Sequence, residues 1–247
     1  MNKTNITSTN LLIILVCLSS NLWADETNKH NYIELKATQW EVDGEDNDTL
    51  FGGGIESQYA VTNNIHIRGG YNQHRNTDVT FSDYYVGLGL SSSPIYDLTI
   101  TGYSNFKKTN LDAKSYQDKA ILDIDEITLG VSLKYQLFDQ LSFLSQFEVI
   151  DTNTEFKFNE TNDESFQFKD SFHLYKTIFG LQGRFKNLSY KLTKDKYHSS
   201  NENELFLKDN RIIAKVAYHF TENFSLGISR EFNTEIDVSQ LMVRYSL

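Results

Sequence analysis

The sequence predicts an all-β protein: a transmembrane antiparallel up-and-down β-barrel of about twelve strands, within a range of eight to twelve. Three observations predict this fold. Apolar and polar residues alternate in recurring stretches near the ~9–11 residues with which a tilted strand crosses a bilayer. Charged residues stand in the middle of the polar phase, and no amphipathic helical stretch of comparable length occurs. An apolar export signal precedes the first stretch.

The N-terminus is predicted to be a signal peptide over residues 1–24, followed by one barrel domain over residues 25–247. Lys3 gives a positive n-region, residues 11–18 form an apolar core too short to span a bilayer, and Ala24 precedes an acidic pair. Cys17, the single cysteine, lies inside that core, so the mature chain would contain no disulfide.

The first hairpin, residues 52–73, shows the pattern of the elements that follow. Ile55 and Tyr59 alternate with Glu56 and Gln58 before the turn at residues 62–64, and the alternation then resumes. We predict strands that begin near residues 31, 50, 65, 82, 97, 124, 141, 172, 188, 211, 224 and 238.

The connections between these strands are predicted to alternate in length. Short turns are expected at 62–64, 91–96, 138–140, 186–187 and 221–223, and long loops near 42–49, 74–81, 107–123, 151–171, 199–210 and 232–237. Strict alternation would place all short turns at the periplasmic end with both termini, and all long loops outside, as in outer-membrane barrels.

The polar phase is predicted to face the lumen and the apolar phase the lipid. A ring of about twelve strands is too wide for its side chains to fill, because about eight strands just close around them. Aromatic residues beside the short turns fit a girdle at the membrane interface: Tyr59, Tyr135, Phe138, Phe147, Phe185, Tyr218, Phe220, Phe224 and Tyr245. Glycines recur on the inner phase, where a missing side chain opens room: Gly52, Gly54, Gly87, Gly89, Gly130, Gly180 and Gly227.

The predicted lumen is mildly basic although the whole chain carries a formal net charge of −10. Its inner phase holds Lys36, Arg68, Lys134, Lys176, Arg184, Lys191, Lys215 and Arg244, against Glu34, Glu56, Glu126 and Glu148. Two interpretations stay open. The charges either form a pore whose field favours anions, or pair across strands and fill the interior.

Several segments carry a family resemblance. Residues 52–59 (GGGIESQY) with 63–72 (NNIHIRGGYN), 135–142 (YQLFDQLS) and 218–227 (YHFTENFSLG) resemble the OmpA-like outer-membrane β-barrel domain. The final LMVRYSL resembles the terminal strand that the barrel-assembly machinery binds, with Leu247 where Phe is usual. The type member of that family has about eight strands, whereas the pattern here gives about twelve, as in narrow pores for acidic oligosaccharides and in outer-membrane phospholipase.

One motif points to acyl hydrolysis. His198-x-Ser200-Asn201 is similar to the H-x-S-N motif of outer-membrane phospholipase and lipid A 3-O-deacylase. The phase of the strand that starts near residue 188 puts His198 and Ser200 on the outward face, and Asn210 has the same phase on the next strand. A base beside a hydroxyl nucleophile with an orienting third group is the minimum for acyl transfer. Outward Lys194 and Lys196 and the acidic Glu202 weigh against this interpretation.

The function predicted is therefore a porin-like passive channel for small, anionic solutes, or a structural barrel, in the outer membrane of a Gram-negative cell envelope. An acyl hydrolase and a surface adhesin that binds through the loops at 107–123 and 151–171 are the alternatives. Expected partners are outer-membrane lipid, lipopolysaccharide and the assembly machinery. The sequence predicts no enzymatic role, cofactor, metal site or nucleic-acid surface, and it assigns no catalytic residue and no oligomeric state.

Overall fold

The computed structural model describes residues 31–42, 49–115, 118–159, 165–199, 210–233 and 236–247. The predicted signal peptide, with Cys17, lies outside the described residues. Within those residues, no helix is long and apolar enough to cross a membrane.

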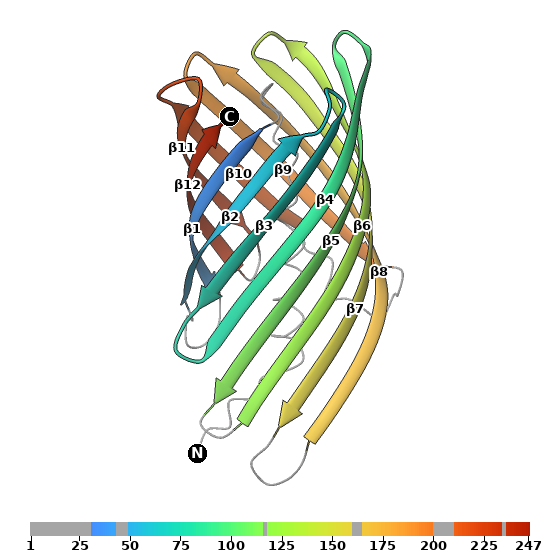
Figure 1. Ribbon diagram of the computed structural model, residues 1–247, viewed down its shortest axis with the longest axis vertical. Helices are drawn as coiled ribbons and strands as arrows, with labels where there is room; N and C mark the ends of the chain where they lie inside the picture. The colour runs from blue at the N-terminus through green and yellow to red at the C-terminus, as the bar shows by residue number, and fades with distance from the viewer. Residues whose placement is uncertain (1–30, 43–48, 116–117, 160–164, 200–209, 234–235) are drawn as a thin grey trace.

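The chain folds into one closed antiparallel barrel in which each strand pairs with its neighbours in sequence and β1 pairs with β12 (Figure 1). The predicted number of strands and their up-and-down order are confirmed. The strands are β1 (Tyr32–Val42), β2 (Thr49–Ala60), β3 (Ile65–Arg75), β4 (Val79–Ile95), β5 (Leu98–Ser115), β6 (Asp118–Phe138), β7 (Leu141–Asn159), β8 (Ser165–Phe185), β9 (Leu188–Ser199), β10 (Asn210–His219), β11 (Phe224–Phe232) and β12 (Ile236–Ser246).

The five short turns gather at one end of the barrel, at the top of Figure 1, and the predicted turn at 91–96 shrinks to 96–97 because β4 continues to Ile95. Thr62 and Thr221 each cap a turn through the side-chain hydroxyl, which accepts hydrogen bonds from backbone N–H groups at 3.0 Å and 3.2 Å. The start of β1 and the end of β12 lie at this same end, where the Leu247 N–H donates to the Asn31 carbonyl at 2.9 Å. We call it the short-turn end, and the opposite end the extended end.

The apolar phase faces outward, as the sequence predicts. Leu129 and Val86 on the outer face are 59% and 58% exposed, whereas Glu148 and Lys176 on the inner face are 0% and 1% exposed. The predicted aromatic girdle is confirmed beside the short turns, with one exception. Phe147 lies farther along β7, opposite Val131, because it stands six residues into a strand that begins at Leu141.

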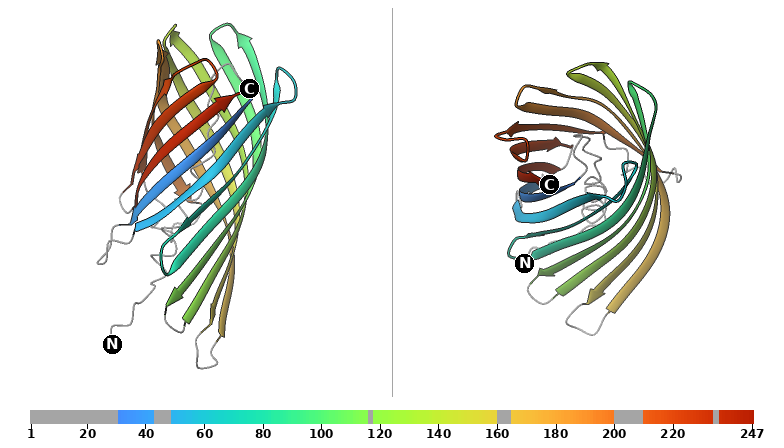
Figure 2. Two further views of the ribbon diagram at one scale, coloured as in Figure 1. Left: turned by 60° about the vertical axis from the view of Figure 1, so that its left-hand side comes forward. Right: turned by 45° about the horizontal axis from the view of Figure 1, so that its top comes forward.

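The strands differ in length, and this difference corrects the predicted loops. β5, β6, β7 and β8 have 18, 21, 19 and 21 residues, whereas β1–β3 and β9–β12 have 9 to 12. The longer strands project as a wall beyond the rest of the ring (Figures 1 and 2). The predicted loops at 107–123 and 151–171 are therefore wrong. Those residues are mostly strand, and the connections near 74–81 and 232–237 shrink to 76–78 and 233–235.

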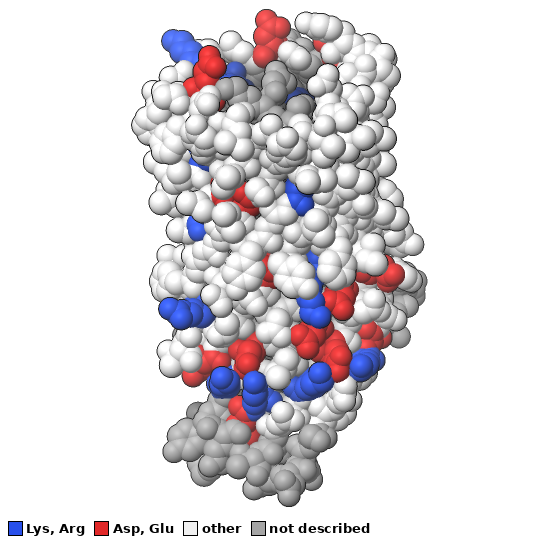
Figure 3. Space-filling view, viewed as in Figure 1, with Lys and Arg blue, Asp and Glu red and all other residues white. Residues whose placement is uncertain are grey.

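The alternation continues along the wall with its phase reversed. On β6, Ile127 and Leu129 face outward within the apolar band, whereas Asp123 and Asp125 occupy the same outer phase farther along. The inner phase there is apolar and buried, with Leu122 and Ile124 at 0% exposure. Such a reversal is expected where a sheet leaves hydrocarbon, because its outer face then meets water. Figure 3 shows this change on one face of the barrel, where charged side chains gather toward the extended end below a largely uncharged band.

The inward apolar residues form what we call the extended-end cluster. It joins Trp40, Leu50, Phe81, Leu111, Ala113, Ala120, Leu122, Ile124 and Val238. Phe156 and Phe158 of β7 pack against it, and the Trp40 indole stacks on the His74 imidazole with 4.3 Å between ring centroids. The apolar packing of this barrel thus lies inside the extended end.

Candidate functional site in the barrel interior

The interior changes character along the barrel axis. Next to the extended-end cluster lies a layer of buried ion pairs, which we call the ionic layer. Beyond it, a cavity opens at the short-turn end, which we call the vestibule. Each section is built from the inner phase of several strands, so a site here is a property of the ring rather than of any one segment.

One half of the ionic layer is centred on β8, β9 and β10. The Lys176 Nζ lies 3.4 Å from the carboxylates of both Glu148 and Asp195. Arg211 donates to Asp195 at 2.6 Å and to Glu231 at 2.9 Å. The side chains of Lys176, Glu148, Asp195 and Arg211 are at most 1% exposed, so each charge depends on the others for compensation.

The other half is centred on Glu34 of β1. Its carboxylate accepts a hydrogen bond from the Arg244 Nε at 2.9 Å and forms an ion pair with the Arg244 Nη2 at 2.7 Å, and both Lys36 and Lys215 lie 3.7 Å away. On β2, Glu56 accepts hydrogen bonds from Lys36 at 2.5 Å and from the Tyr32 hydroxyl at 2.6 Å. Lys215 reaches Glu34 from β10, so this contact passes over β11 and β12.

Inner glycines permit such contacts over an intervening strand. The Tyr103 ring of β5 lies over Gly130 of β6 and donates its hydroxyl to Glu148 of β7 at 2.7 Å. Arg68 of β3 reaches Asn105 of β5 at 3.0 Å, while the Asn105 amide lies over Gly87 of β4. A Cβ at Gly130 or Gly87 would occupy the space of these side chains. The predicted room on the inner phase is thus filled by polar side chains lying flat along the wall.

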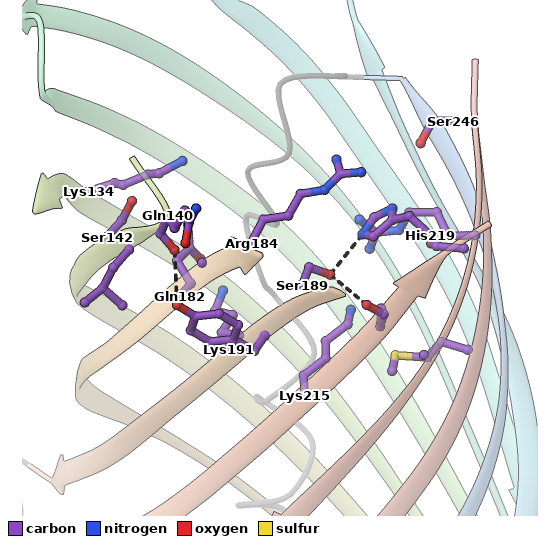
Figure 4. A pocket seen from close by; sticks show the side chains of 18 of the residues that line it. Lys134, Gln140, Ser142, Gln182, Arg184, Ser189, Lys191, Lys215, His219 and Ser246 are labelled. Carbon is purple, nitrogen blue, oxygen red and sulfur yellow. Dashed lines mark hydrogen bonds between the residues drawn. The ribbon is translucent and has the colours of Figure 1, made fainter. Parts of the chain in front are cut away.

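The vestibule is a cavity of about 540 Å³ with a basic excess in its lining. It holds five lysines and arginines, Lys134, Arg184, Lys191, Lys215 and Arg244, against the three carboxylates Glu34, Asp139 and Glu222. Figure 4 shows Lys134, Arg184, Lys191 and Lys215 approaching the same cavity from different strands. Ser189 and His219 also line it and form a hydrogen bond at 3.0 Å.

The structure places every charged residue predicted for the lumen on the inner face, and most of them belong to the ionic layer or the vestibule. Arg68 instead binds Asn105, and Glu126 lies 4.0 Å from Lys107. The two interpretations of the charges hold at different levels, with pairing in the ionic layer and a basic excess in the vestibule. Three further lumen charges were not predicted, although a strict count of phase from Lys191, Lys215 and Gly227 identifies them: Asp195, Arg211 and Glu231. Two more buried charges were not predicted: Lys107, which fell in a predicted loop, and Asp83, although it lies in the strand predicted from residue 82.

The proposed hydrolase residues are only partly described. His198 lies exposed on the outer face of β9, opposite Tyr175, and Asn210 faces outward opposite Lys196, as the phase predicts. Ser200 and Asn201 lie outside the described residues. Among the residues that the structure describes, no group of three His, Cys, Asp or Glu side chains could hold a metal ion.

Comparisons with known proteins give the fold. No family model matches the chain, and no curated protein matches it, so the OmpA-like resemblance stays a prediction. Among solved structures, the NanC porin has a TM-score of 0.63 at 9% identity, covering 86% of this chain and 100% of that one. The KdgM porin in complex with disordered oligogalacturonate has a TM-score of 0.59 at 8% identity, covering 87% and 99%. The translocator domain of the autotransporter NalP from Neisseria meningitidis has a TM-score of 0.56 at 8% identity, covering 96% and 94%. The chain thus has the fold of outer-membrane porins and autotransporter barrels.

Proposed function

We propose that this protein is a porin-like passive channel of the outer membrane that favours small anionic solutes. The short-turn end faces the periplasm and the extended end faces outward, as is usual for this architecture. The observation that carries the proposal is the vestibule, where five basic side chains face three carboxylates in one cavity. In a confined volume with low-dielectric walls, such an excess raises the local concentration of anions.

The ionic layer provides the constriction of the proposed channel. Arg244 and Lys215 belong to both sections, because they line the vestibule and also bind Glu34. An anion that leaves the vestibule therefore meets two cations whose present partner is a carboxylate, and it can take the place of that partner. Conduction needs binding of this kind, strong enough for entry and weak enough for release. The KdgM porin in complex with oligogalacturonate offers a precedent within this fold.

The test is the reversal potential of the purified, heat-modifiable barrel in planar bilayers under a salt gradient. We expect conductance with an anion preference, and a reversal potential shifted toward cation selectivity in the triple variant Lys134→Gln/Arg184→Gln/Lys191→Gln. Lys169→Gln is the matched control, because Lys169 is exposed on the outer face of β8 and pairs there with Glu155 at 3.3 Å. Silent bilayers, or an anion preference unchanged by the triple variant, would overturn the proposal.

The acyl-hydrolase alternative has a separate test. If His198 and Ser200 form a catalytic pair, the wild type hydrolyses phospholipid and Ser200→Ala abolishes the release of fatty acid. No release from the folded wild type ends that alternative. The adhesin alternative loses its predicted loops, since residues 107–123 and 151–171 mostly belong to the wall.

A further inference from the structure

Two lysines project from β9 toward the surrounding lipid. Lys194 and Lys196 are exposed on the outer face, and His198 follows them on the same phase. In the sheet register, Lys194 lies between Phe179 of β8 and Ile212 of β10, which both belong to the exposed apolar surface. Lys196 lies between Thr177 and Asn210. The lysines therefore lie at the edge of the apolar band that is nearest the extended end.

Several of the other outward basic residues near the extended end have carboxylate partners. These ion pairs are Lys108–Asp125 at 3.6 Å, Lys119–Asp112 at 3.0 Å, Lys157–Glu155 at 2.9 Å, Lys169–Glu155 at 3.3 Å and Arg230–Asp237 at 2.9 Å. In the described part of the chain, no carboxylate forms an ion pair with Lys194 or Lys196. Their lateral neighbours are an aromatic, an aliphatic, a hydroxyl and an amide side chain.

This arrangement does not favour the fold by itself. A lysine on the lipid face of a barrel lowers the free energy of unfolding by about 2–4 kcal/mol at the bilayer midplane. The cost is smaller near the interface, where the aliphatic stem lets the ammonium group reach the lipid headgroups. Residues two apart on one face of a strand are separated by about 7 Å, so the two ammonium groups also repel each other. An anion supplied from the membrane would remove both penalties.

We propose that Lys194 and Lys196, with His198 next to them toward the extended end, bind the phosphate groups of a phosphorylated lipid in the outer leaflet. At the external edge of the apolar band, lipid phosphates are the anions at the right depth, and Phe179, Ile212 and Tyr175 supply apolar surface for acyl chains. Two ammonium groups along one strand can hold one phosphate each or share one as point charges. This site lies outside the barrel and is independent of any transport through it.

The experiment measures retention of phosphorylated lipid A by the folded barrel in detergent, using native mass spectrometry. We expect Lys194→Gln/Lys196→Gln to weaken binding about thirty-fold. Each lysine near a lipid surface raises the affinity by a factor of roughly five, and two lysines are removed. Lys108→Gln/Lys157→Gln is the matched control, because it removes two outward lysines that have carboxylate partners. We expect this control to bind like the wild type.

Two further probes identify the ligand chemistry. Dephosphorylated lipid A should bind the wild type as weakly as phosphorylated lipid A binds the double variant. Inorganic phosphate alone should not bind the site at concentrations at which the lipid binds it. Equal binding by the wild type and the double variant would overturn the proposal, as would equal binding of the two lipids or saturation by inorganic phosphate. The heat-modifiable gel shift reports that each variant is folded.

Discussion

Single glycines on the inner face decide which polar side chains can meet across a strand. Gly130 leaves room for the Tyr103 ring, and the hydroxyl of that ring reaches Glu148, which in turn lies beside Lys176. The amide of Gln146 donates to Glu148 at 2.6 Å and also to the Tyr103 hydroxyl. One missing Cβ therefore supports a connected set of buried hydrogen bonds.

Gly130→Val should displace Tyr103 and weaken this set. Crowding of a packed site typically costs about 1–3 kcal/mol, so the urea midpoint of barrel unfolding should fall, as followed by the heat-modifiable gel shift. Gly102→Val is the control, because a Cβ at Gly102 on the outer face of β5 would meet no atom within 4 Å. Equal midpoints for the two variants would contradict the role given to Gly130.

Asp195→Asn tests the buried charges directly. Asp195 binds Arg211 at 2.6 Å and lies 3.4 Å from Lys176, so its neutralisation leaves both cations short of compensation. Removal of one partner from a buried pair costs about 3–5 kcal/mol in the free energy of unfolding. Asp237→Asn, which breaks an exposed pair with Arg230, should change the same free energy by roughly 0–1 kcal/mol. A small effect at Asp195 would mean that water already compensates these charges.

At the scale of the element, each long strand carries two patterns of opposite phase. If apolar residues are expected on one constant phase, β5 is predicted to end near residue 106 and β6 to begin near residue 124. The reason is that the outer phase becomes polar at Lys108 and Asp125. The continuing sheet carries its apolar residues on the other phase, at Leu111, Leu122 and Ile124. The sequence contains this reversal. It becomes interpretable once two neighbouring strands are expected to leave the membrane together.

Leu122→Ala should loosen the wall while leaving the membrane-spanning part of the barrel folded. Leu122 is 0% exposed in the extended-end cluster, and such a truncation typically costs about 2–5 kcal/mol. We expect faster tryptic cleavage at Lys114 or Lys119 in the folded protein. Asp125→Ala, which removes one partner of an exposed pair on the same strand, is the control and should be cleaved at the wild-type rate. Unchanged cleavage of Leu122→Ala would show that the cluster does not hold the wall.

At the scale of the molecule, the sequence predicts the ring, its order and its orientation, because lipid outside and water at both ends impose a pattern of period two on every strand. The vestibule follows from that orientation, since Lys134, Lys191 and Lys215 are identified by phase alone. The pairs in the ionic layer do not follow from phase. They depend on register and on which strands a side chain can cross, as Lys215 does to reach Glu34.

The height of the apolar band can be measured along β6. Ile127 and Asp125 are successive residues on its outer face. Ile127 is 52% exposed, with Phe106 of β5 on one side and Asp151 of β7 on the other, and Asp125 pairs with Lys108. In a mature chain with Trp40 replaced by Phe, Ile127→Trp should emit at shorter wavelength and be quenched by brominated lipid. A tryptophan at position 125 should be quenched by aqueous acrylamide instead. The same quenching at both positions would misplace the boundary.

The pairing of β1 with β12, from Tyr32 opposite Ser246 to Val42 opposite Ile236, joins the two ends of the described sheet. Until the last eleven residues of that sheet are in place, two rows of backbone amides and carbonyls stay open, and within hydrocarbon they have no water to bind. A chain interrupted before β12 is consequently more than a slightly shorter barrel. It is an aggregation-prone intermediate with two unpaired strand edges, which the cell must either protect or degrade. Assembly of the barrel therefore either reaches completion or fails.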